Sequence, residues 1–485
     1  MANAFNWISL SSPRVVWLAA MSRFNPRILP LVIASALFME QMDSTIIATS
    51  LPDIARDLGV DPVSLKLAFT TYLLGLMVVL PVSGWLADRF GAKRIFRLAI
   101  VVFTLGSVGC GLAEGLVWLV VCRGLQGVGG ALMVPVGRII LLRSVKKSEL
   151  LDALAWLTIP ALVGPVIGPP IGGFITTIYH WRFIFWMNLP FGILAFVLAT
   201  WLMPKLKAEH VAPLDIRGFF LTGTGLTLTV LGATVAGRGL LLNWQVAAMI
   251  VAGLLLLVAY VFHARRVQNP LLDLAMFRIP TYRHSVAGGA LFRIAIGATP
   301  FLMPLMMQLG FGFSALDTGL VTFASTLGAL AMKFTVGRIV RRFGFRELLI
   351  VNGVLCCLSI AAKGLFTAHT PYLVMFGVLL AAGFLRSLQF SSLNTLAYAD
   401  VDRADMAKAN ALYTVIQQLS LAAGVALAAF VLDARLAWSG RHVLEAGDFS
   451  FAFYFVSALS VFSVYSFFKL ERSAGASVSG RLAEE

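Results

Sequence analysis

The sequence predicts an all-α membrane protein with fourteen transmembrane helices, arranged as two six-helix bundles with two further helices inserted between them. The 485-residue chain is 59% hydrophobic and 13% charged, with a mean hydropathy of +0.88, whereas soluble domains carry roughly 25% charged residues. Apolar stretches of about 20 residues recur along the chain, and each is long enough to cross a bilayer as a helix. A short motif also occurs twice, once in each half, which indicates an internal repeat.

The expected spans are the apolar stretches between charged or Pro/Gly-rich breaks. The first seven spans are Ile28–Thr49, Leu65–Leu86, Ile95–Ala113, Leu116–Val136, Leu151–Ile175, Phe183–Leu202 and Phe219–Ala236. The second seven are Val246–Phe262, Ser285–Met307, Leu316–Val336, Leu348–Leu365, Tyr372–Leu393, Ala407–Leu432 and Phe449–Phe468.

These spans divide the chain into five parts. They are a cytoplasmic N-terminal tail (1–26), an N-terminal six-helix bundle (27–203), a linker with two extra transmembrane helices (204–284), a C-terminal six-helix bundle (285–469) and a cytoplasmic C-terminal tail (470–485).

Positive charge indicates the orientation of the chain in the membrane. With both termini inside, about 27 of the 38 Lys and Arg residues fall in cytoplasmic connections and about 6 outside, as expected because short cytoplasmic loops retain positive charge. The net charge of +15 therefore reports topology rather than a nucleic-acid partner. The four cysteines lie within apolar spans without metal-ligand spacing and are expected to be buried thiols.

The repeat compares the connection after span 2, GWLADRFGAKR, with the connection after span 10, GRIVRRFGFRE. Gly84 corresponds to Gly337 and Gly91 to Gly344, at the same offset. Repeats of this kind place a transporter's binding site near the midplane, between the two halves.

The connection after span 2 has the features of a latch. We expect Gly84 to be closely packed, Gly91 to form a turn, and Asp88 to pair with or cap a neighbouring helix end. The cations of the motif can bind acidic partners or lipid phosphates; they are Arg89, Lys93 and Arg94. Simple anchoring at a positive inner face is the alternative, and it explains the cations but not the acid or the glycine spacing.

Span 5 contains a run of glycines and prolines. Gly164, Gly168 and Gly172 are four residues apart, so they form one face that another helix can approach closely. Prolines in the same run remove backbone donors and are expected to kink the helix. The residues of this motif are Gly164, Pro165, Gly168, Pro169, Gly172 and Gly173. An ordinary packing face is the alternative.

Ionisable residues inside a membrane are costly and suggest function. Glu40 and Asp43 lie three residues apart on span 1, and two carboxyls in a low dielectric do not ionise together easily, which suits a proton carrier. Arg123 in span 4 can supply the counter-charge. The alternatives are a structural ion pair and, for Glu40, a side chain that reaches the membrane surface.

The second half contributes cations and amides that could line a substrate cavity. We expect this cavity to contain Gln126, Arg293, Arg386, Asn394 and Gln417. A cavity with carboxylates on one side and cations on the other could hold a cationic or an anionic amphiphile. Lys333, near the end of span 10, is a further cation of the second half. The alternative is that its side chain only extends to the cytoplasmic face.

Together these motifs resemble the drug:proton antiporters with fourteen spans in the major facilitator superfamily. The matching elements are Asp43 and Thr45 at the end of span 1, the Gly84–Gly91 connection, Arg123-x-x-Gln126-Gly127 in span 4, and the span 5 motif. The resemblance implies the major facilitator fold, export rather than uptake from span 5, conformational switching at the connection, and proton recognition by the span 1 acids.

The resemblance further implies a multi-pass bacterial inner-membrane protein that exchanges protons for drug-like or amphiphilic molecules. No enzyme activity, metal or cofactor is expected, because the proton gradient supplies the energy. The partners are the lipid bilayer, the small-molecule substrate and protons, and no nucleic acid. A metabolite, sugar or siderophore cargo on the same fold is the alternative. The sequence leaves open whether a periplasmic accessory protein takes part.

Overall fold

The computed structural model describes residues 28–144, 150–204, 206, 211, 213–235, 242–402, 405–441, 443–471 and 474–475. The expected tail at 1–26 and most of the tail at 470–485 lie outside these residues. Within the described part the regular structure is helical throughout. Thirteen helices there are long and apolar enough to cross a membrane. The remaining expected span is occupied by α8 (Leu150–Ile178), whose described side chains begin at Val163 and form a shorter apolar stretch, 163–178.

Each bundle is built from six long helical segments. The first contains α2 (Ile28–Ile46) continued by η1 (Ile47–Ser50) and α3 (Leu51–Asp57), α4 (Lys66–Val79) continued by η3 (Leu80–Val82) and α5 (Ser83–Phe90), α6 (Ala92–Gly111), α7 (Leu116–Ser144), α8, and α9 (Phe183–Trp186) with α10 (Asn188–Leu202). The inserted helices are α11 (Ile216–Val235) and α12 (Asn243–Ala264). The second contains α13 (Pro280–Leu305), α14 (Ala315–Lys333) with α15 (Val336–Phe343), α16 (Phe345–Lys363), α17 (Tyr372–Ala397), α18 (Met406–Ser439) and α19 (Ala446–Phe468).

Two segments differ from the expected spans. Helical structure in span 1 continues to Asp57. A 3₁₀ turn, η1, joins α2 to α3. Pro52 fits the first turn of α3, because the backbone donor that proline lacks has no helical partner there. The connection after span 2 is the helix α5 rather than a loop, and a similar 3₁₀ turn containing Pro81 joins it to α4.

The repeat is visible in how these short helices end. α5 stops at Gly91 with φ +95° and α15 at Gly344 with φ +73°, values that favour glycine. Each glycine also precedes the next long helix, α6 or α16. The corresponding glycines therefore make the same turn in both halves.

Helix packing repeats as well. A Cβ on Gly75 of α4 would lie 2.6 Å from the carbonyl oxygen of Gly124 on α7, and Gly328 of α14 meets the carbonyl of Leu380 on α17 in the same way. Such contacts require glycine, because backbone atoms cannot move aside for a side chain. α4 and α7 thus correspond to α14 and α17.

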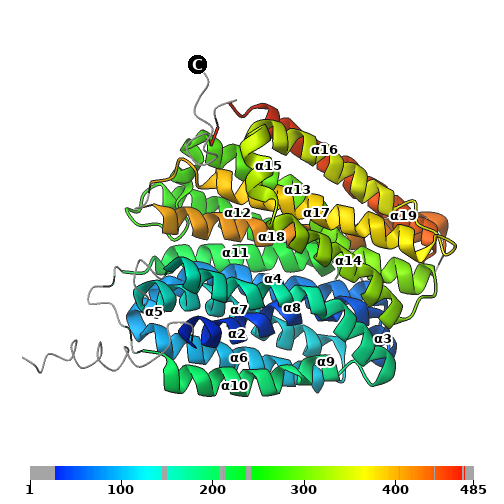
Figure 1. Ribbon diagram of the computed structural model, residues 1–485, viewed down its shortest axis with the longest axis horizontal. Coiled ribbons are helices and arrows are strands. Elements are labelled where there is room, and N and C mark those ends of the chain that lie inside the picture. The colour runs from blue at the N-terminus through cyan, green and yellow to red at the C-terminus, as the bar shows by residue number, and fades with distance from the viewer. Residues whose placement is uncertain are drawn as a thin grey trace, which may run out of the picture.

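The two halves lie side by side with α11 between them at one edge (Figure 1). We call the end of the bundle that contains Asp57 the Asp57 end and the opposite end, with Gly91 and Gly344, the Gly91 end. One continuous apolar core joins both halves towards the Asp57 end, including Ile46 and Leu51 from the first half and Met303 from the second.

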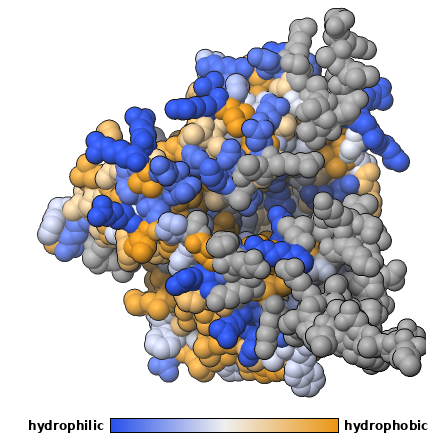
Figure 2. Space-filling view, turned by 90° about the vertical axis from the view of Figure 1, so that its left-hand side faces the viewer, coloured by the Kyte–Doolittle hydropathy of each residue, from blue (hydrophilic) through white to orange (hydrophobic). Residues whose placement is uncertain are grey.

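Polar contacts between the halves also lie at the Asp57 end. Gln308 donates to the backbone carbonyl of Thr49 at 2.8 Å, the backbone N–H of Leu316 donates to Thr177 at 3.1 Å, and Lys66 pairs with Asp433 at 3.7 Å. At the Gly91 end, hydrophilic side chains surround a hollow between the halves (Figure 2). The seam is therefore closed at the Asp57 end.

Candidate functional site

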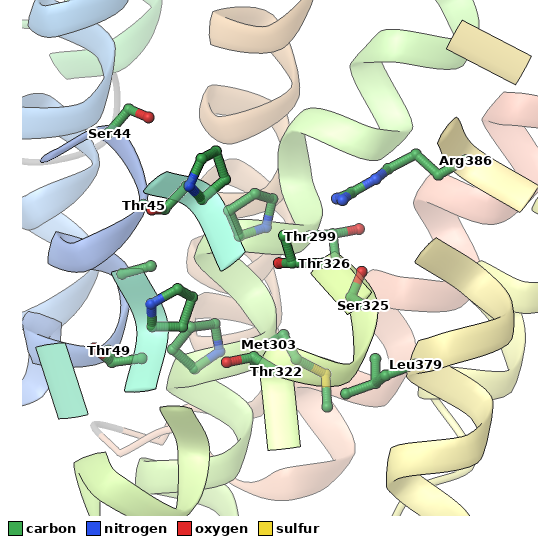
Figure 3. A pocket seen from close by; sticks show the side chains of 15 residues that line it. Ser44, Thr45, Thr49, Thr299, Met303, Thr322, Ser325, Thr326, Leu379 and Arg386 are labelled. Atoms are coloured by element: carbon green, nitrogen blue, oxygen red, sulfur yellow. The ribbon is translucent and has the colours of Figure 1, made fainter. Parts of the chain in front are cut away.

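A cavity of about 180 Å³ lies between the two halves. Helices α2 and α8 line it from the first half, and α13, α14 and α17 from the second (Figure 3). Its described lining combines hydroxyl, proline and apolar side chains with one charged residue: Ser44, Thr45, Ala48, Thr49, Pro165, Pro169, Thr299, Pro300, Met303, Pro304, Thr322, Ser325, Thr326, Leu379 and Arg386.

The cavity contains one of the five side chains that were expected in it. Arg386 extends from α17 into the space beside Thr299, Ser325 and Thr326 (Figure 3). The other four are not among its described lining residues: Gln126, Arg293, Asn394 and Gln417. Helix rotation explains the difference, since a polar side chain in an apolar span can face the interior of its own half instead.

Asp43 lies inside the first half and has the partner that the sequence predicts. One Asp43 oxygen pairs with the Arg123 guanidinium at 2.5 Å, and both side chains are buried. Its other oxygen accepts hydrogen bonds from Gln126 at 3.1 Å and from Asn188 at 2.7 Å. Arg123 also donates to the Gln126 side chain at 2.8 Å. The carboxylate is thus fully partnered, as a buried charge must be.

Helix α10 completes this network through Asn188. Its amide donates both to Asp43 and to the hydroxyl of Ser107 on α6, at 2.9 Å, and Ser107 donates to the backbone carbonyl of Phe185. The network around Asp43 therefore joins four helices of the first half: α2, α7 and α10 directly, and α6 through Asn188.

Glu40 has different partners from Asp43, although both lie on α2. The hydroxyl of Tyr72 on α4 donates to one Glu40 oxygen at 2.7 Å, and the amide of Gln41 donates to the other at 2.7 Å. The Glu40 side chain is 4% exposed, so it is buried in the bundle and does not reach the membrane surface. No described cation pairs with it. The Arg123 guanidinium lies over the Tyr72 ring, 4.5 Å from its centroid, and so links the two acids indirectly.

The glycine face of α8 packs against α2, as expected. A Cβ on Gly164 would lie 3.0 Å from the carbonyl oxygen of Phe38, and one on Gly172 would lie 2.5 Å from that of Ile46. Gly173 instead faces Ala315 of α14, across the seam. Despite its prolines, the helix is continuous from end to end. This motif therefore forms part of both the cavity wall and the contact between the halves.

The connection after span 2 differs in part from expectation. Asp88 pairs with Arg143 near the end of α7 at 2.8 Å, which confirms the expected link to a neighbouring helix end. Lys93 donates to the backbone carbonyl of Met203, where α10 ends, at 2.7 Å. Gly84 is not closely packed, because a Cβ there would meet nothing within 4 Å. Arg89 and Arg94, the other cations of the motif, are exposed.

Arg293 and Asn394 form a separate cluster inside the second half. The buried guanidinium of Arg293 donates to the hydroxyl of Tyr413, which donates to Asn394 at 2.5 Å. Arg293 also lies over the rings of Phe390 and Tyr413, at 5.3 and 4.7 Å. The four cysteines are free and buried, as expected.

Several residues of the site were missed from the sequence. Of these missed residues, Asn188 and Tyr72 could have been found in the sequence, because each is a polar group within an apolar stretch. The hydroxyls lining the cavity give none, because threonine and serine in membrane helices commonly bond their own backbone, as Thr45 and Thr322 do here.

Comparison with known proteins decides the family. The model of the Major Facilitator Superfamily matches residues 33–425 and 285–483. The chain belongs to this superfamily. Its members are transporters, so this major facilitator protein is a multi-pass membrane transporter and not an enzyme.

Relatives and solved structures agree with this assignment. MdtD of Enterobacter sp. (strain 638), provisionally named a multidrug resistance protein, is 38% identical over 406 residues, covering 83% of this chain and 85% of MdtD. MdtD of Salmonella paratyphi A is 36% identical over 402 residues with the same coverage. These matches support a multidrug efflux permease within the major facilitators.

Two crystal structures have a similar fold. The peptide-transporter family member PepTSo has a TM-score of 0.68 at 14% identity, covering 94% of this chain and 99% of PepTSo. A bacterial homologue of the human lysosomal transporter Spinster has a TM-score of 0.63 at 14% identity, covering 94% of this chain and 98% of the homologue. At such identities the likeness concerns the fold alone.

Proposed function

We propose that this transporter exports drug-like or amphiphilic small molecules across a bacterial inner membrane in exchange for protons. The names of its relatives support the drug-like cargo, and the proline- and glycine-rich motif of α8, which forms part of the cavity wall, supports export. Protons flowing inward supply the energy, and no bound cofactor takes part.

The observation that carries the proton-coupling proposal is the environment of Glu40. This carboxyl is buried and hydrogen-bonded to the neutral groups of Tyr72 and Gln41, whereas Asp43 on the same helix has Arg123 as a counter-charge. Removing a carboxylate from water without a counter-charge is costly, and protonation abolishes that cost. Glu40 is therefore the proton carrier, and the Asp43–Arg123 pair holds α2 in position beside it.

The placement of the contacts between the halves supports alternating access. The cavity lies at the seam, and the described polar bonds across the seam are at the Asp57 end. Rocking of the halves about the central cavity breaks these bonds and closes the Gly91 end. The connection helices α5 and α15, which end at equivalent glycines, lie where that closure takes place.

The basic residues support a cytoplasmic location of the Gly91 end. The connections at the Gly91 end contain cations such as Arg89, Arg94 and Arg341, and short cytoplasmic loops are positive. The Gly91 end is therefore cytoplasmic, together with both termini, and the described state opens towards the cytoplasm.

Proton release from proteoliposomes tests the proposal. The purified full-length protein is reconstituted in vesicles with an acidic lumen, and cationic, neutral and anionic amphiphiles are added outside while the lumenal pH is followed. At least one compound should dissipate the pH gradient with the wild-type protein. Glu40→Gln keeps the shape of the side chain and one of its two hydrogen-bond acceptors but cannot cycle a proton, so it should abolish the effect.

The matched control is Glu114→Gln, the same chemical change at an exposed carboxyl in the turn between α6 and α7. This variant should behave like the wild type. Proton exchange is wrong if no compound couples to the gradient, and Glu40 is not the carrier if Glu40→Gln retains wild-type release.

A further inference from the structure

Arg386 is a cation without a partner inside the cavity. Its guanidinium reaches the space lined by Thr299, Ser325 and Thr326 (Figure 3), and no hydrogen bond or ion pair joins it to any residue that the structure describes. Arg123 of the first half, in contrast, pairs with Asp43 at 2.5 Å. An arginine in a membrane protein that lacks a counter-charge is costly, and such residues commonly mark the path of a substrate.

The helical scaffold does not require this side chain. A Cβ on Gly127 of α7 meets the carbonyl of Tyr72, and one on Gly383 of α17 meets that of Ser325, so these glycines are equivalent in the two halves. Arg386 follows Gly383 by three residues, and the position three after Gly127 is another glycine, Gly130. The common architecture is therefore satisfied without a side chain at this position.

The groups around Arg386 also suit an anion. The buried hydroxyl of Thr299 has no hydrogen-bond partner among the described residues, so it is available as a donor beside the guanidinium. None of the described lining residues is an acid. The two acids that precede the lining residues on α2, Glu40 and Asp43, are occupied by their own partners in the first half.

A second buried cation adds to the positive potential of the second half. Arg293 on α13 is fully buried, and no described carboxylate forms an ion pair with it. Electrostatic interactions act over longer distances in a low-dielectric interior. A negative charge in the cavity would therefore be stabilised by more than its direct contacts.

We propose that the molecule transported by this protein is an organic anion, whose carboxylate or similar oxyanion group binds to the guanidinium of Arg386 and the hydroxyl of Thr299. This inference rests on the proposed function and specifies its substrate class. An arginine fork matches the two oxygens of a carboxylate. The prolines and Met303 of the cavity contact the apolar remainder of the molecule.

Substrate charge determines how the exchange responds to voltage. When a monovalent anion leaves the cell and one proton enters, two positive charges move inward in effect, so an inside-negative potential drives the cycle. One-for-one exchange of a monovalent cation for a proton moves no net charge. The two substrate classes therefore predict different voltage dependence for the same protein.

Binding to matched pairs of compounds tests the proposal directly. The probes are carboxylates and their isosteric amides, namely acetate and acetamide, phenylacetate and phenylacetamide, and 2-naphthoate and 2-naphthamide, titrated calorimetrically into the purified full-length protein at pH 7. At least one carboxylate should bind about tenfold or more tightly than its amide, the factor expected for a hydrogen bond to a charged group. Arg386→Gln should abolish this preference, and Thr299→Val should weaken carboxylate binding.

The matched control is Lys333→Gln, which removes a cation from the end of α14 that is hydrogen-bonded to Ser391 instead of facing the cavity. It should keep the wild-type preference. Thermal unfolding checks folding: Arg386→Gln removes an unpaired charge and should not lower the unfolding temperature. The proposal is overturned if no carboxylate is preferred over its amide or if the preference survives in Arg386→Gln.

The outcomes separate this inference from the proposed proton exchange. Proton-coupled transport of cationic or neutral probes without any carboxylate preference would overturn the anion site alone. Carboxylate binding that depends on Arg386, without proton movement in vesicles, would support the anion site and overturn proton exchange. For a transported carboxylate, an inside-negative potassium diffusion potential in vesicles should accelerate its exit, and an unchanged rate would contradict the charge balance.

Discussion

Asp43 and Arg123 form a buried ion pair at 2.5 Å that joins α2 to α7. Both oxygens of the carboxylate have partners. Oδ2 contacts Arg123, and Oδ1 accepts hydrogen bonds from Gln126 and Asn188. The pair also places the guanidinium over the ring of Tyr72, whose hydroxyl holds Glu40. In the proposed mechanism, the ion pair supports the geometry around Glu40, and Glu40 takes up the proton.

Breaking this pair should destabilise the first half. Asp43→Asn and Arg123→Gln each leave a buried charge without its counter-charge, at a cost of about 3–5 kcal/mol. Thermal unfolding of the detergent-solubilised protein should show a clear drop in unfolding temperature for each variant. The double variant removes both charges, so its loss should be smaller than the sum of the two single losses. Additive losses would show that the two side chains do not act as a pair.

Close packing of α8 on α2 gives a second prediction. Gly172→Ala places a Cβ 2.5 Å from the carbonyl oxygen of Ile46, and the backbone of α2 cannot yield locally. The change should destabilise the protein by about 1–3 kcal/mol, as overpacking usually does, measured by thermal unfolding in detergent.

Gly377→Ala in α17 is the matched control for this change. Its Cβ would meet nothing within 4 Å, and alanine favours helix over glycine by up to about 1 kcal/mol. This variant should therefore be neutral or stabilised. Equal destabilisation by both substitutions would mean that the contact with Ile46 is not responsible.

The sequence predicts these contacts to different extents, for physical reasons. The Asp43–Arg123 pairing and the α8 packing face were predictable, because buried charges need partners and small residues at fourfold spacing allow close approach. The close packing expected at Gly84 was wrong, because the spacing of glycines does not by itself show that a neighbouring helix approaches that face. Arg293 and Arg386 could not be distinguished by sequence, since both are cations in apolar spans and only helix rotation decides which one enters the cavity.

The stability of the folded protein is expected to depend on pH through a contact between the two inserted helices. Burial alone would raise the pKa of Asp215, but hydrogen bonds from His263 at 2.7 Å and from the backbone N–H groups of Gly218 and Leu271 lower this pKa below its ordinary value. Asp215 lies just before α11, and His263 is near the end of α12. A lowered pKa in the folded state contributes stability that is present above the unfolded-state pKa and is lost as the pH falls through the folded-state pKa.

Asp215→Asn should therefore be less stable than the wild type at pH 7, by about 1–2 kcal/mol because the group is partly accessible to solvent. The difference should shrink as the pH falls below the ordinary Asp value of 3.8, where the wild-type carboxyl is itself protonated. The stability difference is measured by comparing the unfolding temperatures of the two proteins from pH 7 down to this low pH. A difference that is constant with pH would show that the charge of Asp215 is not what stabilises the contact.

The orientation of the chain can be tested with single exposed cysteines, because the four native cysteines are buried. Glu114→Cys lies in the exposed turn between α6 and α7 at the Asp57 end, and Arg341→Cys lies on the exposed surface of α15 at the Gly91 end. In intact cells a membrane-impermeant maleimide should label Glu114→Cys, and should label Arg341→Cys only after the membrane is permeabilised. The wild-type protein provides the background in both conditions. The reverse pattern would place the Gly91 end outside and would make the closed seam at the Asp57 end a cytoplasmic gate, so the substrate that meets Arg386 would arrive from the opposite side.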